Sequence, residues 1–214
     1  NVSLAVGKVV LPEYPVPFAL IAMLLMTLFA VTAWLLWYRK ELDVFSLKGW
    51  PVALAIFLGF LLSEFINAVP HLRADVLSVR TLVALFYCVV LIGLVEELWW
   101  RGIWFAMFKG RPLVCIVAGS LLFGLLHYHL QGTSGVIVAS LVGLAFAVAR
   151  YRGVSIGALA LAHGFNDWVA QGHVVRWQWH ASSFRIDAVL YFICLALAAG
   201  IWFIKRPPEG SVQL

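Results

Sequence analysis

Acidic and basic side chains interrupt the apolar runs of this sequence at a few points, and their spacing points to chemistry. The stretch "LVEELWWRG" (94–102) places Glu96, Glu97 and Arg101 inside such a run. Residues four apart lie on one face of a helix, so Glu97 and Arg101 can pair. Glu96 projects about 100° away from Glu97. The pattern predicts one carboxylate held ionised by the arginine and a second that is free to take up a proton.

Two further segments carry pairs at the same four-residue step. Phe123 and His127 in "FGLLHYHLQ" put an aromatic ring beside an imidazole. His163 and Asp167 in "HGFNDW" put an imidazole beside a carboxylate, with Asn166 on the adjoining edge. Such a neighbour fixes the tautomer of the imidazole and makes it a directed hydrogen-bond donor. Each pair alone is also typical of buried structure, but three pairs at similar depth favour one shared site.

The elements that must position these residues are predicted to be membrane helices. The chain has 214 residues, of which 64% are hydrophobic and 12% charged, and its mean hydropathy is +0.98. Continuous apolar runs of roughly 18 residues or more match the bilayer thickness as helices. Strands are disfavoured because the period-two alternation of a barrel is missing. We expect an all-α, polytopic transmembrane bundle of about seven spans: 18–38, 50–69, 80–108, 112–130, 134–149, 154–171 and 186–204.

The span 80–108 is too long for one straight crossing, so we expect it to be kinked, tilted or partly interfacial. No segment reads as a linker, and 1–214 is expected to be a single integral membrane domain with a motif-bearing core of about 80–171. Small residues at a four-residue step predict close helix packing: Gly153, Gly157, Ala160 and Gly164. Three dispersed cysteines are expected to be small buried hydrophobes: Cys88, Cys115 and Cys194.

The basic residues predict the orientation of the chain. Nine Lys and Arg fall at alternate span ends: Arg39, Lys40, Lys48, Lys109, Arg111, Arg150, Arg152, Lys205 and Arg206. Five fall at the other ends: Lys8, Arg73, Arg80, Arg176 and Arg185. The positive-inside rule then places the N-terminus outside and the C-terminus inside. The net charge of +5 is not clustered on one surface, so no nucleic-acid partner is expected.

In this order, the three motifs resemble those of the CPBP family of intramembrane proteases. That family includes the CAAX prenyl endoprotease that processes Ras-like proteins, and bacterial bacteriocin-processing and immunity (Abi-like) proteins. Its motifs EExxxR, FxxxH and HxxxN or HxxxD are matched by residues 96–101, 123–127 and 163–167. The resemblance covers about residues 80–171. It implies an enzyme of a prokaryotic cytoplasmic membrane that cleaves a peptide bond in a membrane-associated protein or peptide.

The resemblance also implies a role for each matching residue. Glu96 is expected to be the general base that takes a proton from water, and His127 to hold and polarise that water. His163 and Asp167 are expected to stabilise the oxyanion of the tetrahedral intermediate. Glu97 and Arg101 are expected to hold the motif helix in place.

The last motif position departs from many family members, which carry Asn there. An ionised Asp167 would repel an oxyanion. We therefore expect Asp167 to orient His163, as a carboxylate holds an imidazole in serine proteases. Asn166 is the alternative donor.

Two other interpretations remain beside a glutamate mechanism without a cofactor. One Glu and two His form a catalytic zinc ligand set, so Glu96, His127 and His163 are the candidate ligands of a metalloprotease. No HExxH motif is present, and the metal mechanism is therefore ranked second. The other interpretation is a non-catalytic immunity or transport protein. It is based on the use of intramembrane Glu and His by proton relays as well as by enzymes. Transporters usually carry repeat symmetry, which this sequence does not display.

Overall fold

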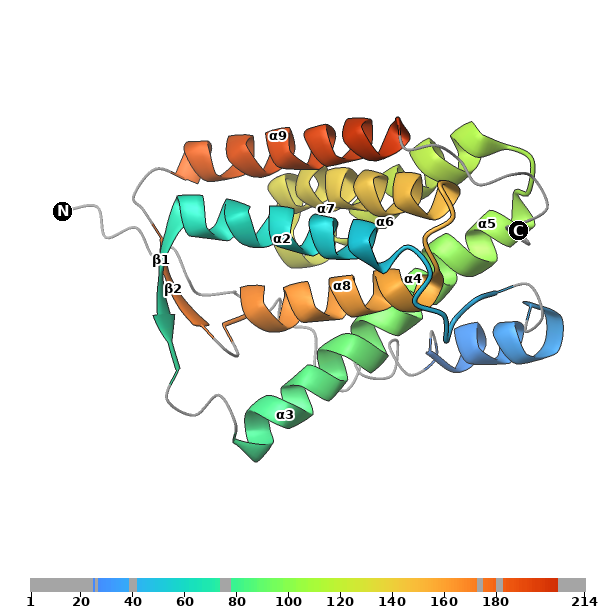
Figure 1. Cartoon of the computed structure of the whole chain (residues 1–214), viewed down its shortest axis with the longest axis horizontal. Helices are drawn as coiled ribbons and strands as arrows, with labels where there is room; N and C mark the ends of the chain where they lie inside the picture. The colour runs from blue at the N-terminus through green and yellow to red at the C-terminus, as the bar shows by residue number, and fades with distance from the viewer. Residues whose placement is uncertain are drawn as a thin grey trace.

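The computed structural model describes residues 25, 27–38, 42–73, 78–172, 175–179 and 183–203, which form a helical bundle with a small sheet at one end (Figure 1). A helix over 27–38 ends in π-helical turns. The elements are η1 (Trp34–Tyr38), α2 (Trp50–Asn67), β1 (Ala68–Leu72), α3 (Val79–Phe86), η2 (Tyr87–Leu94), α4 (Val95–Glu97), η3 (Leu98–Ile103), α5 (Trp104–Met107), η4 (Val114–Ala118), α6 (Gly119–Leu126), α7 (Tyr128–Tyr151), α8 (Ile156–Ala170), β2 (Val175–Trp179) and α9 (Ser183–Trp202).

The segments from α3 to α5 join into one helix, Val79–Met107, which we call the motif helix because it carries the EExxxR motif. It is tilted across the other helices, as its length predicts (Figure 1). Its stretches η2 and η3, on either side of the two glutamates, are π-helical. Such turns are frequent at functional sites, because they change the direction in which neighbouring side chains point.

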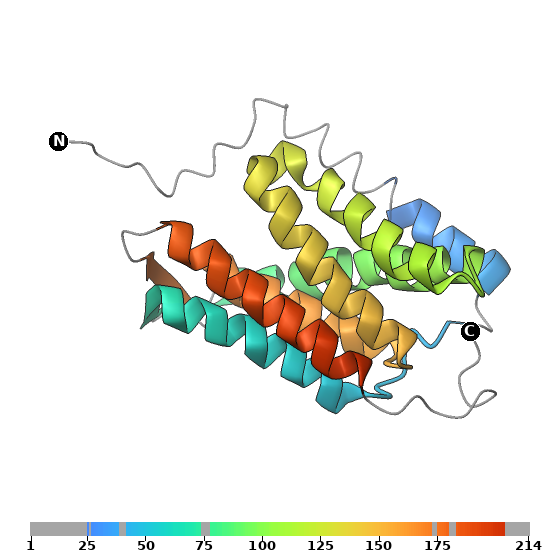
Figure 2. The same cartoon turned by 90° about the horizontal axis from the view of Figure 1, so that it is seen from above.

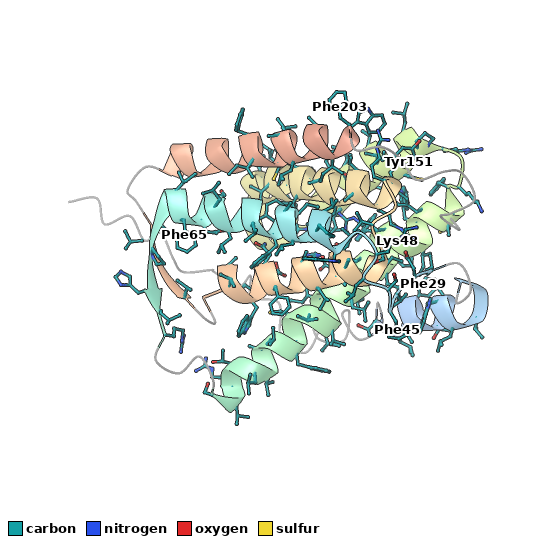
Figure 3. All side chains as sticks on the ribbon, viewed as in Figure 1. Phe29, Phe45, Lys48, Phe65, Tyr151 and Phe203 are labelled. Carbon is teal, nitrogen blue, oxygen red and sulfur yellow. The ribbon has the colours of Figure 1, made fainter. Side chains whose placement is uncertain are left out.

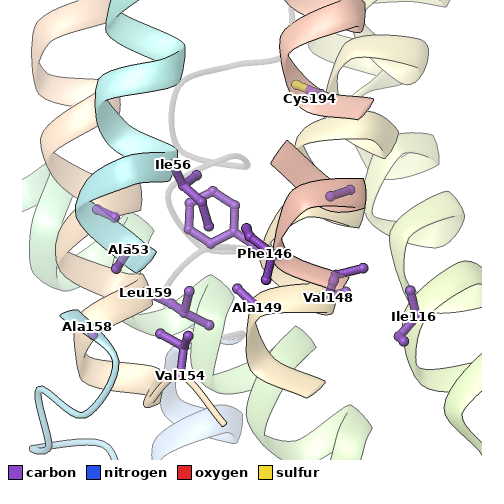
Figure 4. Close-up of a cluster of buried hydrophobic side chains, with 14 of the residues drawn as sticks. Ala53, Ile56, Ile116, Phe146, Val148, Ala149, Val154, Ala158, Leu159 and Cys194 are labelled. Carbon is purple, nitrogen blue, oxygen red and sulfur yellow. The ribbon is translucent and has the colours of Figure 1, made fainter. Parts of the chain in front are cut away.

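Four helices, α2, α7, α8 and α9, lie side by side along the molecule, and α6 packs against α7 (Figures 1 and 2). The apolar core between them surrounds Phe146 of α7, which is 1% exposed. Figure 4 shows its ring close to Ile56 of α2, with Leu159 of α8 and Ala149 below it. This core fixes the helices that surround the polar residues.

Within the described residues, the motif helix is the one helix long and apolar enough, by length and composition, to cross a membrane. Shorter apolar helices accompany it: Thr27–Leu36, Trp50–Ile66, Val114–Leu126, Gly135–Tyr151 and Phe192–Trp202. Large apolar side chains also cover the outside, as Phe65 and Phe203 show (Figure 3). Seven crossings remain a prediction, and the spans predicted at 18–38 and 186–204 lie partly outside the described residues.

Two details of the predicted fold are wrong. The fold is not purely helical, because β1 and β2 pair antiparallel beyond the ends of α2 and α8 (Figure 1). Each strand is only five residues long and lies at the edge of an apolar run, so the sequence pattern does not reveal it. The fourth predicted span also ends at Leu126 and not at 130, and the chain re-enters a helix at Tyr128 with a break at Gly132 (φ 64°, ψ −157°).

Close packing around α8 is confirmed at Gly157 and Gly164, whereas Gly153 lies in the turn before the helix, with φ 91°. A Cβ on Gly164 would lie 2.7 Å from the carbonyl oxygen of Cys88, and one on Gly157 would lie 2.5 Å from that of Ser46. On the facing side, Gly93 of the motif helix is equally close, because a Cβ there would lie 2.9 Å from Gly164 N. The three cysteines are free and buried, as predicted. Backbone contact therefore fixes α8 against the motif helix.

Candidate active site

The two adjacent glutamates of the motif helix have different environments. The Glu97 side chain is 0% exposed, and its Oε1 accepts a hydrogen bond from Arg101 Nη1 at 3.1 Å. The Glu96 side chain is 26% exposed. The predicted pairing of Glu97 with Arg101 is confirmed. Glu96 makes no such bond to Arg101, as its position on a different face of the helix predicts.

Arg101 also joins the motif helix to its neighbours. Its Nη2 donates to the carbonyl oxygen of Gly143 in α7 at 3.1 Å. Its guanidinium carbon lies 4.7 Å from the ring centroid of Phe123 in α6 and 5.6 Å from that of Phe146. Aromatic ring faces stabilise a desolvated cation. Arg101 is thus held by a carboxylate, a carbonyl and two rings.

His163 of α8 lies against both glutamates. Its Nδ1 is 2.8 Å from Glu97 Oε1, a hydrogen bond buried on both sides. Its Nε2 is 3.8 Å from Glu96 Oε2 and 3.9 Å from Asp167 Oδ2. Because an ionised carboxylate only accepts, Nδ1 donates to Glu97. Nε2 is left facing the two partly exposed carboxylates.

This geometry corrects the sequence interpretation of Asp167. The hydrogen bond that orients His163 comes from Glu97, 66 residues away in the sequence, and not from Asp167 one turn along α8. Asp167 instead faces the Nε2 side of the ring and interacts electrostatically with His127 as well as His163. Asn166 is half-buried on the adjoining edge of α8.

His127 lies at the C-cap of α6. Its Nδ1 is 2.8 Å from the carbonyl oxygen of Phe123, and the two rings are 4.7 Å apart at 53°. Since a carbonyl only accepts, Nδ1 carries the proton and Nε2 of a neutral ring has the lone pair. The Phe123 ring is also 6.3 Å from the ring of His163. The predicted contact of Phe123 with His127 is therefore confirmed, and the same ring also neighbours His163.

One oxygen of each glutamate has no hydrogen-bond partner among the described residues. These atoms, Glu96 Oε2 and Glu97 Oε2, are buried. Buried polar atoms without a partner are rare in folded proteins, so each needs an explanation. Glu96 Oε2 lies 3.8 Å from His163 Nε2, which is too long for a direct hydrogen bond.

A preformed metal centre is not found in the described part of the chain, where no three His, Cys, Asp or Glu side chains are grouped as metal ligands. Of the candidate ligands Glu96, His127 and His163, the last uses Nδ1 for Glu97 and has Nε2 available. His127 likewise uses Nδ1 for a carbonyl.

Several residues around the site escaped the sequence interpretation. Phe146 lies 5.5 Å, ring to ring, from His163, and the Gly143 carbonyl binds Arg101. Both lie in residues 135–149 of α7, a stretch whose one polar side chain is Ser140. Tyr87 interacts electrostatically with Glu96 and Asp167. It lies nine residues before Glu96, a step that places two residues on opposite faces of an α-helix, so the sequence spacing gave no signal for it.

The fold and the site thus define a helical protein with an apolar exterior and a buried cluster of glutamate, histidine and arginine. The model of one family, described as Rce1-like, type II CAAX prenyl endopeptidase, matches residues 78–169. All three motifs lie within this range, and the match confirms the resemblance to the CAAX protease family. That family is membrane-embedded, and the resemblance implies an intramembrane endopeptidase. No curated protein and no solved structure matches the chain.

Proposed function

We propose that the protein is a glutamate-dependent intramembrane endopeptidase with Glu96 as its general base. One observation carries this proposal. Arg101 and His163 both bind Glu97, whereas Glu96 Oε2 is buried without a hydrogen-bond partner among the described residues and faces His163 Nε2 at 3.8 Å. Glu96 is therefore the acid that has no arginine or histidine bonded to it to explain a buried carboxylate.

In the proposed reaction, a water molecule binds beside Glu96 and His127. His127 Nε2, the nitrogen that is not bound to Phe123, orients the water. Glu96 removes a proton as the water oxygen bonds to the peptide carbonyl carbon. The proton then passes from Glu96 to the amide nitrogen, the C–N bond breaks, and a carboxylic acid and an amine leave.

The oxyanion of the tetrahedral intermediate is assigned to His163. Because Nδ1 is held by Glu97, a protonated ring presents Nε2–H as a fixed donor. Loss of one such donor costs about 3–4 kcal/mol in a known enzyme. Asp167, 3.9 Å from Nε2, is assigned to balance the charge of the protonated ring until substrate binds, with Asn166 as the nearest alternative amide donor.

The proposed substrate is a membrane-associated protein or peptide that reaches the site in the bilayer. The matching family is described as a type II CAAX prenyl endopeptidase, and a prenylated C-terminus is one candidate. We place the protein in a prokaryotic cytoplasmic membrane, with its N-terminus outside.

The test is cleavage of quenched fluorescent peptides by the purified protein in detergent. One peptide ends in a farnesylated CAAX sequence, and its partner has the same sequence without the lipid. Wild type is compared with Glu96→Gln and His127→Ala. The matched control is Glu64→Gln, which removes a partly buried carboxylate from α2 whose Oε2 is also unpartnered among the described residues.

We expect Glu96→Gln and His127→Ala to lose at least about 100-fold in kcat, and Glu64→Gln to cleave like wild type. Full cleavage by Glu96→Gln would remove the general base from the proposal. Loss of wild-type activity with a chelator, restored by zinc, would favour the metal mechanism. No cleavage of any membrane-associated peptide would favour the non-catalytic alternative.

A further inference from the structure

Arg150, at the C-terminal end of α7, is a second buried arginine beside the site. Its position at the end of a predicted span is confirmed, and its side chain is 1% exposed. Its Nε donates to the carbonyl oxygen of Arg101 at 3.1 Å. Its Nη1 donates to Asp43 Oδ1 at 2.8 Å and to the carbonyl oxygen of Val154 at 3.0 Å. One guanidinium thus binds the motif helix, the loop before α2 and the turn before α8.

Asp43 extends this contact to the start of α8. Its Oδ1 also lies 3.3 Å from the backbone nitrogen of Ile156, which donates to it. The next contacts are made by Ser155, whose Oγ donates to the carbonyl oxygen of Ser46 at 2.7 Å and whose N donates to that of Lys48 at 2.9 Å. The loop and the first turn of α8 therefore form one unit, and Arg150 ties that unit to the motif helix.

The hydrogen bonds at Arg101 and Ile156 lie within two helical turns of the residues of the site. Arg101 follows Glu97 by four residues, or about one helical turn, and Ile156 precedes His163 by seven, or about two turns. The hydrogen bond between Glu97 and His163, at 2.8 Å, joins the same two helices. A small slide of α8 along the motif helix would break it, because hydrogen bonds weaken beyond about 3.2 Å.

We propose that Arg150 is a positioning residue that sets the register of α8 on the motif helix and so holds His163 at Glu97 and Glu96. This inference rests on the proposed function for its catalytic consequence, but its structural consequence is independent of it. Lysine cannot replace this arginine, because an ammonium lacks the planar fork that reaches three acceptors in different directions.

The variants are Arg150→Lys, Arg150→Met and the milder Asp43→Asn. Arg152→Met is the matched control, because Arg152 lies two residues on and binds α9: its guanidinium stacks 4.7 Å from the Trp202 ring and donates to the Trp202 carbonyl. The first readout is the ring nitrogen spectrum of ¹⁵N-histidine-labelled protein in detergent. The signals of His163 are assigned by their loss in His163→Gln. The second readout is kcat and KM for the peptide that wild type cleaves.

We expect the Arg150 variants to shift the His163 ring signals, Asp43→Asn to shift them less in the same direction, and Arg152→Met to leave them unchanged. We also expect Arg150→Lys to lower kcat at least tenfold with KM within about twofold of wild type. Unchanged His163 signals in folded Arg150→Lys and Asp43→Asn would overturn the inference. If wild type cleaves nothing, the proposed function fails, while the nitrogen spectra still decide the role of Arg150.

Discussion

Replacing Glu97 with glutamine removes a buried charge but almost no volume. Arg101 is 2% exposed and donates to Glu97 Oε1, so Glu97→Gln leaves a buried cation without its counter-charge. Removing one partner of such a pair costs about 3–5 kcal/mol. The charge-assisted bond to His163 Nδ1 weakens as well, because a neutral acceptor gives a weaker bond than a carboxylate. We expect Glu97→Gln to lower the free energy of unfolding by about 3–5 kcal/mol.

Glu96→Gln is the matched comparison, since it makes the same chemical change one residue earlier. Glu96 Oε2 has no hydrogen-bond partner among the described residues, so we expect its loss to change the free energy of unfolding by less than about 1 kcal/mol. The double variant Glu97→Gln/Arg101→Met removes both charges, and much of the stability should return. It still loses the bond from Arg101 to the Gly143 carbonyl, which contributes about 1 kcal/mol.

The measurement is equilibrium unfolding in mixed detergent micelles, followed by circular dichroism and by the fluorescence of the 10 tryptophans. The four proteins with and without Glu97→Gln and Arg101→Met form a double-mutant cycle, for which we expect a coupling energy of about 2–3 kcal/mol. Equal destabilisation by Glu96→Gln and Glu97→Gln would refute the division of labour between the two acids, as would a coupling energy near zero.

Two further predictions concern α8. Asp167→Asn should keep activity within about tenfold of wild type, because Glu97 orients His163; complete loss, measured with the same peptides, would show that the Asp167 carboxylate itself is required. Gly164→Ala should destabilise the protein by about 1–3 kcal/mol, because the new Cβ would lie 2.7 Å from the Cys88 carbonyl oxygen. Its control, Gly200→Ala in α9, places a Cβ with nothing within 4 Å and should be neutral or stabilising in the same unfolding measurement.

The sequence predicted that polar residues of different helices lie close together, because polar groups in an apolar run have few explanations other than pairing or function. The structure brings both glutamates next to His163. The four-residue step correctly joined Glu97 to Arg101 and Phe123 to His127. It also placed Asp167 near His163, at 3.9 Å, but it did not predict the hydrogen bond that orients His163, whose partner lies 66 residues away on another helix. Helical spacing describes only neighbours on the same helix, so contacts between helices have to come from the packing.

The same limit applies to the contacts of Arg150, which the sequence did not predict. A basic residue at the end of an apolar run is normally a surface charge, and the positive-inside rule counts it as one. Its burial depends on Asp43, which is 107 residues away and occupies a loop without a motif. The short strands were missed for a local reason: β1 has the sequence "AVPHL" and simply continues the apolar run of α2.

The two acids of "LVEELWWRG" are best understood through the partners of each. A single buried carboxylate cannot both neutralise an arginine and remain available to accept a proton from water. Glu97 satisfies Arg101 and His163 with one oxygen, which leaves Glu96 beside an imidazole that is already oriented. This arrangement needs two adjacent acids on diverging faces of one helix and a histidine delivered by another. The register between the motif helix and α8 is therefore as important to the proposed chemistry as the acids themselves, and Arg150 binds at the point where that register is set.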